Sequence, residues 1–108
     1  MNRRPRLSIG IPVYNGESFL PSLLANLTSQ TFRDIEIVIS DNASTDGTAG
    51  ICREWMQRDE RIRYSRNPHN LGASANFNKV FTLAQAPLFK WAPVDDSYAP
   101  DYLETCVR

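Results

Sequence analysis

The sequence predicts an α/β domain with an open, mainly parallel, Rossmann-like sheet and helices on its faces. Three observations lead to this prediction: short apolar runs alternate with amphipathic segments, the β-α order repeats four times, and the second run is apolar almost throughout. Such alternation is typical of parallel sheets with right-handed crossovers, and a strand without a polar side is covered on both faces. At 108 residues the chain is one domain or a piece of one.

The first strand is predicted over Leu7–Val13, which is apolar and leads into the turn residues Tyr14–Gly16. The next segment is predicted to be a helix, with start signals at Glu17, Ser18 and Pro21. Its apolar residues fall on one helical face, and they are Phe19, Leu20, Leu23, Leu24 and Leu27.

The second strand is predicted over Ile35–Ser40, whose Ile and Val content fits a central parallel strand. A polar stretch follows and leads into a second helix, with an apolar face made by Ile51, Cys52, Trp55 and Met56. Residues 61–65 alternate in polarity and predict a short, more exposed third strand.

The third helix is predicted over residues 73–86, because apolar residues recur there at helical spacing as Phe77, Val80, Phe81 and Ala84. The fourth strand is predicted over residues 88–94 and is expected to be buried. Both tryptophans, Trp55 and Trp91, are expected to pack in the core. A further helix is predicted to begin at Pro100.

Polar residues follow directly on three predicted strands, as the pairs Tyr14-Asn15, Asp41-Asn42 and Asp95-Asp96. Because ligands of parallel α/β sheets bind at the carboxyl ends of the strands, we expect these pairs to converge on one rim. Two adjacent carboxylates after a buried strand are costly unless a cation or donors neutralise them. The aspartate pair therefore predicts a hard divalent metal that carries a phosphorylated ligand, and Tyr14 predicts contact with a planar base.

Several other kinds of site are weighed against this one. Asp41 alone is also compatible with a turn or helix cap. Residues 42–47 resemble the first half of a calcium loop, but Arg53 stands at its twelfth position, so a helix cap by Ser44, Thr45 or Asp46 is preferred. Neither a G-x-G-x-x-G turn nor a P-loop is present, which argues against the usual dinucleotide and P-loop sites. His69 is the only histidine and leaves little material for a zinc site or a histidine triad.

Composition restricts the partners and the compartment. Twelve basic and twelve acidic residues cancel to a net charge of zero, so no nucleic-acid partner is expected. The two cysteines stand in no metal-ligand spacing and are predicted to be reduced. Gly10 and Pro12 interrupt the apolar run after the basic start Met1–Arg6, so no secretory signal is expected. The predicted location is the cytoplasm, at the inner face of the membrane where further segments anchor the protein.

Five segments in order resemble the family 2 glycosyltransferases of the GT-A fold, enzymes that use nucleotide-sugar donors. Residues 7–15 are similar to the opening Ser-Ile-x-x-Pro-x-Tyr-Asn strand, and residues 27–32 to the end of the first helix. Residues 37–47 are similar to the Val-x-Asp-x-x-Ser-x-Asp-Gly segment. Asn70-Leu-Gly72 with Asn78 has the spacing of the third connection, and residues 91–103 resemble the Asp-x-Asp region that ends in Pro-Asp-Tyr-Leu.

The resemblance implies a nucleotide-sugar site formed by Pro12, Tyr14, Asn15, Asp41, Asn78 and Asp95. Within it, Pro12 and Tyr14 would border the base, and Asp41 would accept a hydrogen bond from a base N–H group. Asp95 would lie near the ribose or the sugar. Asp96 would ligate Mg²⁺ or Mn²⁺, which binds the diphosphate and offsets charge on the leaving group.

The resemblance also implies what the chain lacks. The third helix has Asn76-Phe77-Asn78 where the family often has Ala-Arg-Asn, so no arginine contact is carried over. The acceptor-binding half, with the general base of an inverting displacement onto an unidentified acceptor hydroxyl, is expected beyond Arg108. Residues 1–108 are thus predicted to be the donor-binding part of a longer glycosyltransferase of cell-wall or polysaccharide biosynthesis, inactive alone and prone to self-association. The alternative is a non-catalytic nucleotide-binding or regulatory module.

Overall fold

The structure is a computed structural model that describes residues 5–107, so most of the basic start Met1–Arg6 lies outside it. Strands and helices alternate along the chain as predicted. They are β1 (Leu7–Val13), α1 (Leu20–Thr28), β2 (Ile35–Asp41), α2 (Thr48–Arg58), β3 (Ile62–Arg66), α3 (Ala73–Leu83), β4 (Leu88–Trp91) and α4 (Tyr102–Val107). The four strands form one sheet in the order β3-β2-β1-β4, and every pairing is parallel. The predicted fold class is confirmed.

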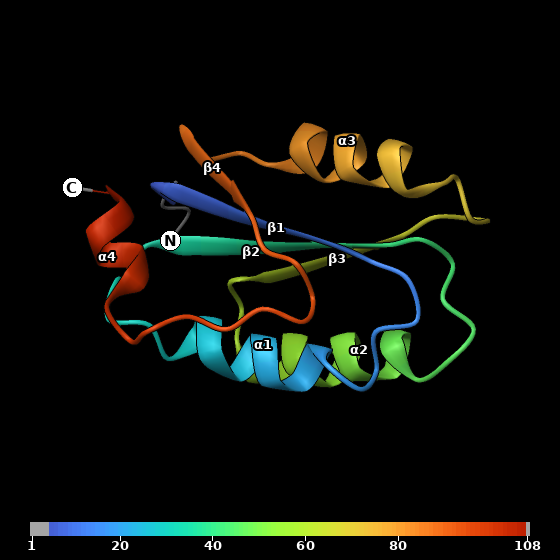
Figure 1. Cartoon of the computed structure of the whole chain (residues 1–108), viewed down its shortest axis with the longest axis horizontal. Helices are drawn as coiled ribbons and strands as arrows, with labels where there is room; N and C mark the ends of the chain where they lie inside the picture. The colour runs from blue at the N-terminus through green and yellow to red at the C-terminus, as the bar shows by residue number, and fades with distance from the viewer. Residues whose placement is uncertain (1–4, 108) are drawn as a thin grey trace.

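The elements are stacked in three layers (Figure 1). Helix α3 covers one face of the sheet, and α1 and α2 cover the other. The loops that follow β1 and β2 lie together at one end of the molecule, while both chain termini lie toward the opposite end. The first end carries the carboxyl ends of the two central strands, where an α/β sheet binds its ligands.

The core is built around the two central strands. Every residue of β1 and of β2 is buried, because each strand has a neighbour on both sides and helices on both faces. From α1 the core receives the four predicted leucines, Leu20, Leu23, Leu24 and Leu27. Each such side chain stabilises the fold by roughly 1.5–3 kcal/mol relative to exposure, so the two strands and α1 form a rigid base for the rim.

Helix α3 approaches the sheet closely because β1 carries a glycine beneath it. A Cβ at Gly10 would lie 2.1 Å from Val80 Cγ1 and 2.7 Å from the Phe89 ring. At those distances any side chain at this position would force Val80 and Phe89 to shift. Gly10 therefore sets the distance between α3 and the sheet, and with it the position of the residues that α3 brings to the rim.

The apolar residues whose spacing predicted α3 do not all lie on its buried side. Asn76 and Val80 are the buried residues of this helix, whereas Phe77 and Phe81 are 42% and 58% exposed. The reason is polar: the Asn76 amide accepts from Ser40 Oγ at 2.7 Å and donates to the Ser40 carbonyl at 2.9 Å. These bonds turn the asparagine toward β2 and leave the phenylalanines at the edge. The helix also ends at Leu83, earlier than predicted.

The first helix also differs from its prediction at one end. It begins at Leu20 with Phe19 at the N-cap and no side-chain cap, so Ser18 does not fill that role. Phe19 precedes the helical periodicity and is 52% exposed, contrary to its predicted place on the buried face. Pro21 lies in the first turn as expected, where its missing N–H costs nothing.

The fourth strand is short and lies at the edge of the sheet rather than in its interior. It ends at Trp91 and pairs only with β1 among the described strands. With one neighbour only, its residues stay half-buried or exposed, and Trp91 is 42% exposed instead of packed in the core. Trp55 is half-buried against the core. The prediction of a buried fourth strand was therefore wrong.

The cysteines are reduced in the structure, as predicted. Cys52 is buried, Cys106 is exposed, and both are free thiols. Burial, followed by the nearby Asp41 charge, raises the pKa of the Cys52 thiol to about 12, which keeps it protonated and unreactive. Among residues 5–107, no helix has the length and apolar content to cross a membrane.

Candidate functional site

The two loops that follow β1 and β2 hold each other in place. The Asn15 N–H donates to Ser44 Oγ at 2.8 Å, and the Thr45 N–H donates to Asn15 Oδ1 at 2.8 Å. The Gly16 N–H donates to Thr48 Oγ1 at 3.0 Å. Asn15 adopts a left-handed backbone with φ of 51°, which asparagine tolerates better than most residues. The Asn15 side chain therefore fixes the loop that carries Tyr14.

Asp46 completes this contact at the start of α2. Its carboxylate accepts hydrogen bonds from the Thr48 N–H at 3.0 Å and from the Glu17 N–H at 3.2 Å. Burial alone would raise the pKa of Asp46, but these hydrogen bonds outweigh it and hold the pKa below its usual value. Of the three predicted capping residues, Asp46 alone binds the first helical residue, while Gly47 occupies the N-cap position itself.

Asp41 lies at the end of β2 with no exposed side-chain surface. Its Oδ1 accepts the Ser44 N–H at 2.9 Å. Its Oδ2 accepts the Tyr64 hydroxyl at 2.6 Å and Arg66 NH1 at 3.2 Å. Burial and this bond raise the pKa of Tyr64 to about 12. A base N–H could reach the carboxylate only after Tyr64 or Arg66 releases it, so the role predicted for Asp41 stays a prediction.

A network of asparagine amides lies next to Asp41, between β2 and the loop before α3. Asn67 Nδ2 donates to Asn42 Oδ1 at 2.9 Å and to Asn76 Oδ1 at 3.0 Å. Asn42 Nδ2 donates to Asn70 Oδ1 at 2.8 Å, and Asn42 Oδ1 accepts the Leu71 N–H at 2.9 Å. Asn42, Asn67 and Asn76 are buried, and a buried amide network of this kind is rigid when its groups are paired. It fixes the loop at residues 70–72 against the sheet.

These elements surround a hollow of about 200 Å³ at the rim, lined by Pro12, Val13, Tyr14, Asn42, Asn70, Ala73, Asn76 and Phe77. A neighbouring hollow of about 490 Å³ shares Ala73 and Phe77 and is also lined by Ser74, Asn78 and Trp91. Of the predicted site residues, Pro12 and Tyr14 thus line the first hollow and Asn78 lines the second.

Sequence reasoning missed Phe77 and the asparagines at 70 and 76 as lining residues. Phe77 entered the prediction only as one of the apolar residues whose spacing, with Val80 and Phe81, is helical. The asparagines carried a detectable signal, since amide side chains recur at 67, 70, 76 and 78 around one helix start. Buried amide groups are hydrogen-bonded in folded proteins, so this cluster could have predicted that the loop before α3 is ordered by hydrogen bonds between amides.

The aspartate pair lies in an exposed turn after β4, not at its end. Both Asp95 and Asp96 are exposed, and the Asp96 N–H donates to the Pro93 carbonyl at 3.0 Å. The predicted desolvation cost is therefore absent, because the fourth strand stops before reaching them. The turn adjoins the loop after β1, since a Cβ at Gly16 would lie 3.0 Å from Val94 Cγ2.

The donor set of this turn fits a hard divalent cation. Exposed carboxylate oxygens are ligands that Mg²⁺ and Mn²⁺ take. The Tyr98 hydroxyl beside them is buried and has no hydrogen-bond partner among residues 5–107. Burial and then the Asp96 carboxylate raise the pKa of Tyr98. The described residues hold no group of three or more potential ligands from His, Cys, Asp and Glu, so a metal here would need further ligands from a bound molecule.

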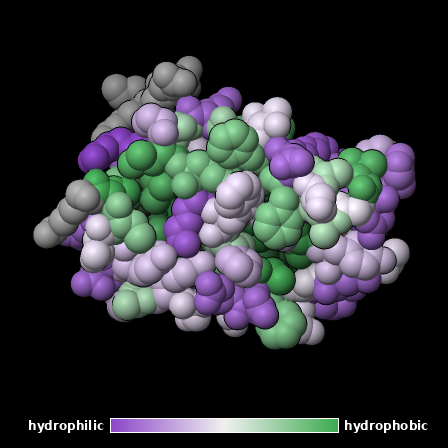
Figure 2. All heavy atoms as spheres, turned by 45° about the horizontal axis from the view of Figure 1, so that its top comes forward, coloured by the Kyte–Doolittle hydropathy of each residue, from purple (hydrophilic) through white to green (hydrophobic). Residues whose placement is uncertain are grey.

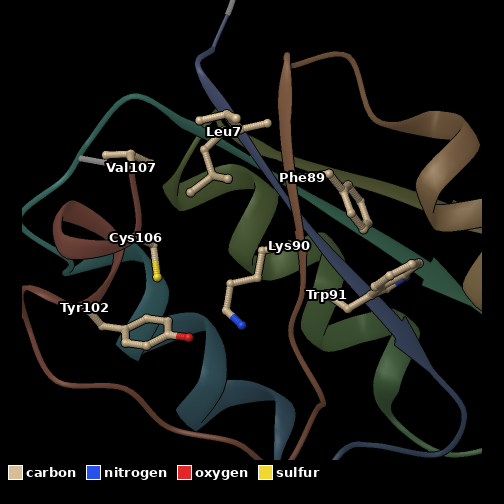
Figure 3. Close-up of a pocket in the computed structure, with 8 residues that line it drawn as sticks. Leu7, Phe89, Lys90, Trp91, Tyr102, Cys106 and Val107 are labelled. Carbon is tan, nitrogen blue, oxygen red and sulfur yellow. The ribbon is translucent and has the colours of Figure 1, made fainter.

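A third hollow, of about 470 Å³, lies between β4 and α4 and has a different chemistry. Figure 3 shows Lys90 pointing toward Tyr102, with Cys106 and Val107 nearby, while Phe89 and Trp91 lie on the other side of β4. Lys90 Nζ lies 5.3 Å from the ring centres of both Tyr98 and Tyr102. No aspartate or glutamate lines this hollow, and it is separate from the loops after β1 and β2.

The chain was compared with known proteins. The family model described as glycosyl transferase family 2 matches residues 8–108. The chain belongs to glycosyltransferase family 2. Abequosyltransferase RfbV of Salmonella typhimurium is 41% identical to this glycosyltransferase chain over 100 residues, 90% of this chain and 30% of the relative. Glycosyltransferase GlyA of Streptococcus pneumoniae is 34% identical over 103 residues, 95% of this chain and 15% of the relative.

Solved structures share the fold of this family 2 chain. TarS 1–349 of S. aureus in complex with UDP has a TM-score of 0.87 at 25% identity, over 94% of this chain and 31% of that one. The mannosyltransferase PcManGT from Pyrobaculum calidifontis, in complex with GDP-Man and Mn²⁺, has a TM-score of 0.88 at 25% identity, over 97% and 32%. The chain thus spans about a third or less of the proteins named here. The predicted family and Rossmann-like GT-A fold are confirmed.

Proposed function

We propose that this chain is the donor-binding part of a glycosyltransferase that moves a sugar from a nucleoside-diphosphate donor to an acceptor hydroxyl, with inversion at the anomeric carbon. The observation that carries the proposal is the hollow at the rim, where Pro12 and Tyr14 meet the amide network at the carboxyl ends of the central strands. Support also comes from the relatives whose structures hold UDP or GDP-Man. The place we propose is cell-wall or polysaccharide biosynthesis.

In this proposal each predicted residue has a part in holding the donor. Pro12 and Tyr14 border the base, with Asn15 fixing their loop, and Asp41 receives a base N–H once Tyr64 or Arg66 releases it. The remaining members of the site are Asn78, in the second hollow, and Asp95, which lies near the ribose or sugar. The general base and the acceptor contacts are assigned to no residue described here, so the chain by itself is expected not to turn over.

Asp96 is assigned to a divalent metal, Mg²⁺ or Mn²⁺. Its carboxylate is exposed and lies in the turn next to the loop after β1, so it can reach a ligand in the rim. When bound, such a metal neutralises charge on the diphosphate and on the departing nucleoside diphosphate. Mn²⁺ in the PcManGT complex supports this assignment.

Calorimetric titration of the 108-residue chain with nucleoside diphosphates, with and without Mn²⁺, tests the proposal. We expect metal-dependent binding that Asp96→Ala abolishes and Asp95→Ala weakens less. Asp101→Ala is the matched control, because Asp101 is also exposed and close in sequence but lies outside the acidic turn. If all three variants lose affinity equally, the loss is explained by the change in net charge, and the assignment of Asp96 to a metal is wrong.

The base contact is tested separately with Asp41→Asn. Uracil presents an N3–H donor where cytosine presents an acceptor, so the ratio of UDP to CDP affinity should fall in this variant. If the folded variant keeps the wild-type ratio of UDP to CDP affinity, Asp41 does not contact the base. If the wild-type chain binds no nucleoside diphosphate at all, the donor-binding proposal itself fails.

A further inference from the structure

Two exposed aromatic rings line the first hollow from different elements. Tyr14 comes from the loop after β1 and Phe77 from α3, and both belong to its lining. Their side chains are 49% and 42% exposed. A hollow with aromatic walls and a few convergent polar groups, here the amides of the network, is typical of a site for a small planar ligand.

The Phe77 ring is held in position by aromatic side chains behind it. Trp91 lies 6.2 Å from it between ring centres, and Trp91 Nε1 donates to the Phe77 carbonyl at 3.4 Å. Trp91 is in turn packed edge-on against Phe89, with centres 4.9 Å apart, and Phe89 is packed edge-on against Phe81 at 5.1 Å. Such pairs add stability beyond their buried area. The cluster thus supports one wall of the hollow.

The surface that α3 and β4 present has further apolar side chains. Figure 2, which brings this side of the molecule forward, shows apolar patches interrupted by polar side chains. Phe81 is the more exposed of the two α3 phenylalanines at 58%, yet it lines neither rim hollow. Phe77 lines both. The two residues are therefore alike in chemistry and helix, and they differ in their relation to the hollows.

We propose that Phe77 is a base-stacking residue, which forms with Tyr14 the aromatic walls that hold the planar base of the nucleoside diphosphate. This inference rests on the proposed function and extends it to a residue that the sequence did not assign to the site. A neutral ring cannot pair with phosphate, so its contribution goes to the base alone. Stacking of this kind tolerates every base, because each has a π-face.

The test compares Phe77→Ala with Phe81→Ala in titrations with UDP and, separately, with inorganic pyrophosphate and Mn²⁺. We expect Phe77→Ala to weaken UDP binding by roughly 5- to 140-fold, the loss found when a stacking ring is removed, and to leave pyrophosphate binding unchanged. Phe81→Ala removes a ring that packs on Phe89 and Trp91 but lines neither rim hollow, so it should weaken UDP binding less than Phe77→Ala and leave pyrophosphate binding unchanged. Phe77→Tyr, which restores the ring, should recover most of the UDP affinity.

Three outcomes would overturn the inference while the proposed function stands. One is UDP affinity that falls equally in Phe77→Ala and Phe81→Ala. Another is a parallel loss of pyrophosphate affinity, which would mean general damage to the site. The third is failure of Phe77→Tyr to restore binding. Failure of the wild-type chain to bind UDP would instead overturn the proposed function, and the inference with it.

Discussion

Replacing Asp41 by asparagine should destabilise the chain even in the absence of any ligand. The substitution keeps the shape of the side chain but removes its charge and turns one acceptor into a donor. In the folded protein this carboxylate is fully buried and accepts from the Ser44 N–H, the Tyr64 hydroxyl and Arg66. The amide oxygen of asparagine can replace only one of the two carboxylate oxygens, while its NH₂ group faces the donors at the other.

The size of the effect follows from these three bonds. Hydrogen bonds to a charged group contribute about 1.5–3 kcal/mol each, and the loss concerns chiefly the bonds to Ser44 and Tyr64. The Arg66 side chain is 43% exposed, so its ion pair is screened and contributes roughly 0–1 kcal/mol. With one bond kept in weakened form, Asp41→Asn should lower the free energy of unfolding by about 2–3 kcal/mol.

Urea denaturation followed by tryptophan fluorescence measures this change. For a small domain the expected loss corresponds to a midpoint lower by about 1 M urea. Tyr64→Phe alone should cost about 1.5–3 kcal/mol, and it should cost less in the Asp41→Asn background, because the bond between the two residues is weakened or lost there. The reasoning is refuted if the free energy of unfolding of Asp41→Asn lies within about 0.5 kcal/mol of the wild-type value. It is also refuted if Tyr64→Phe lowers that free energy by the same amount in both backgrounds.

Three further predictions concern stability, pH and association. Burial would raise the pKa of Glu36, but hydrogen bonds from Ser8, Gln85 and Arg63 outweigh it and lower the pKa. The ionised Glu36 should therefore stabilise the fold fully above about pH 4.5, and this contribution should be lost as the pH falls through the folded-state pKa. The free energy of unfolding of Glu36→Gln should accordingly change less with acid pH than that of the wild type. Gly10→Ala should cost about 1–3 kcal/mol by overpacking, whereas Gly50→Ala, in α2 with nothing within 4 Å of the added Cβ, should stabilise by about 0.5–1 kcal/mol in thermal unfolding. The exposed edge at β4 should make the chain self-associate in sedimentation velocity, and Leu88→Lys should reduce this; a wild-type monomer at high concentration would contradict it.

The order of the elements could be predicted because each is defined locally. β1 and β2 are rich in Ile, Val and Leu, and the leucines of α1 recur at helical spacing, so composition and spacing agreed with the final packing. Near β4 the local sequence did not decide between a central and an edge strand, because residues 88–94 are apolar except for Lys90, and such a run is compatible with both. Only the strand order shows that it has one neighbour and that it ends before the aspartate pair.

The site residues also fall into those that the sequence could place and those that it could not. Pro12 and Tyr14 could be placed because they follow directly on a strand, and strand ends meet at one rim. Phe77 could not be placed, because the rotation of α3 depends on a hydrogen bond between Asn76 and Ser40, two residues far apart in the sequence. A hydrogen bond between distant residues does not alter the spacing of apolar residues in either segment, so the sequence pattern does not show it.

The strand order also has a consequence for synthesis of the chain. β1 is synthesised well before β4, which is one of its two neighbours in the sheet. In the interval β1 can pair with β2, but the side that receives Leu88–Trp91 remains open. An open apolar strand is the kind of surface that chaperones bind and that aggregates when folding is delayed. Slow or stalled translation before residue 88 should therefore increase the risk that the unfinished chain aggregates.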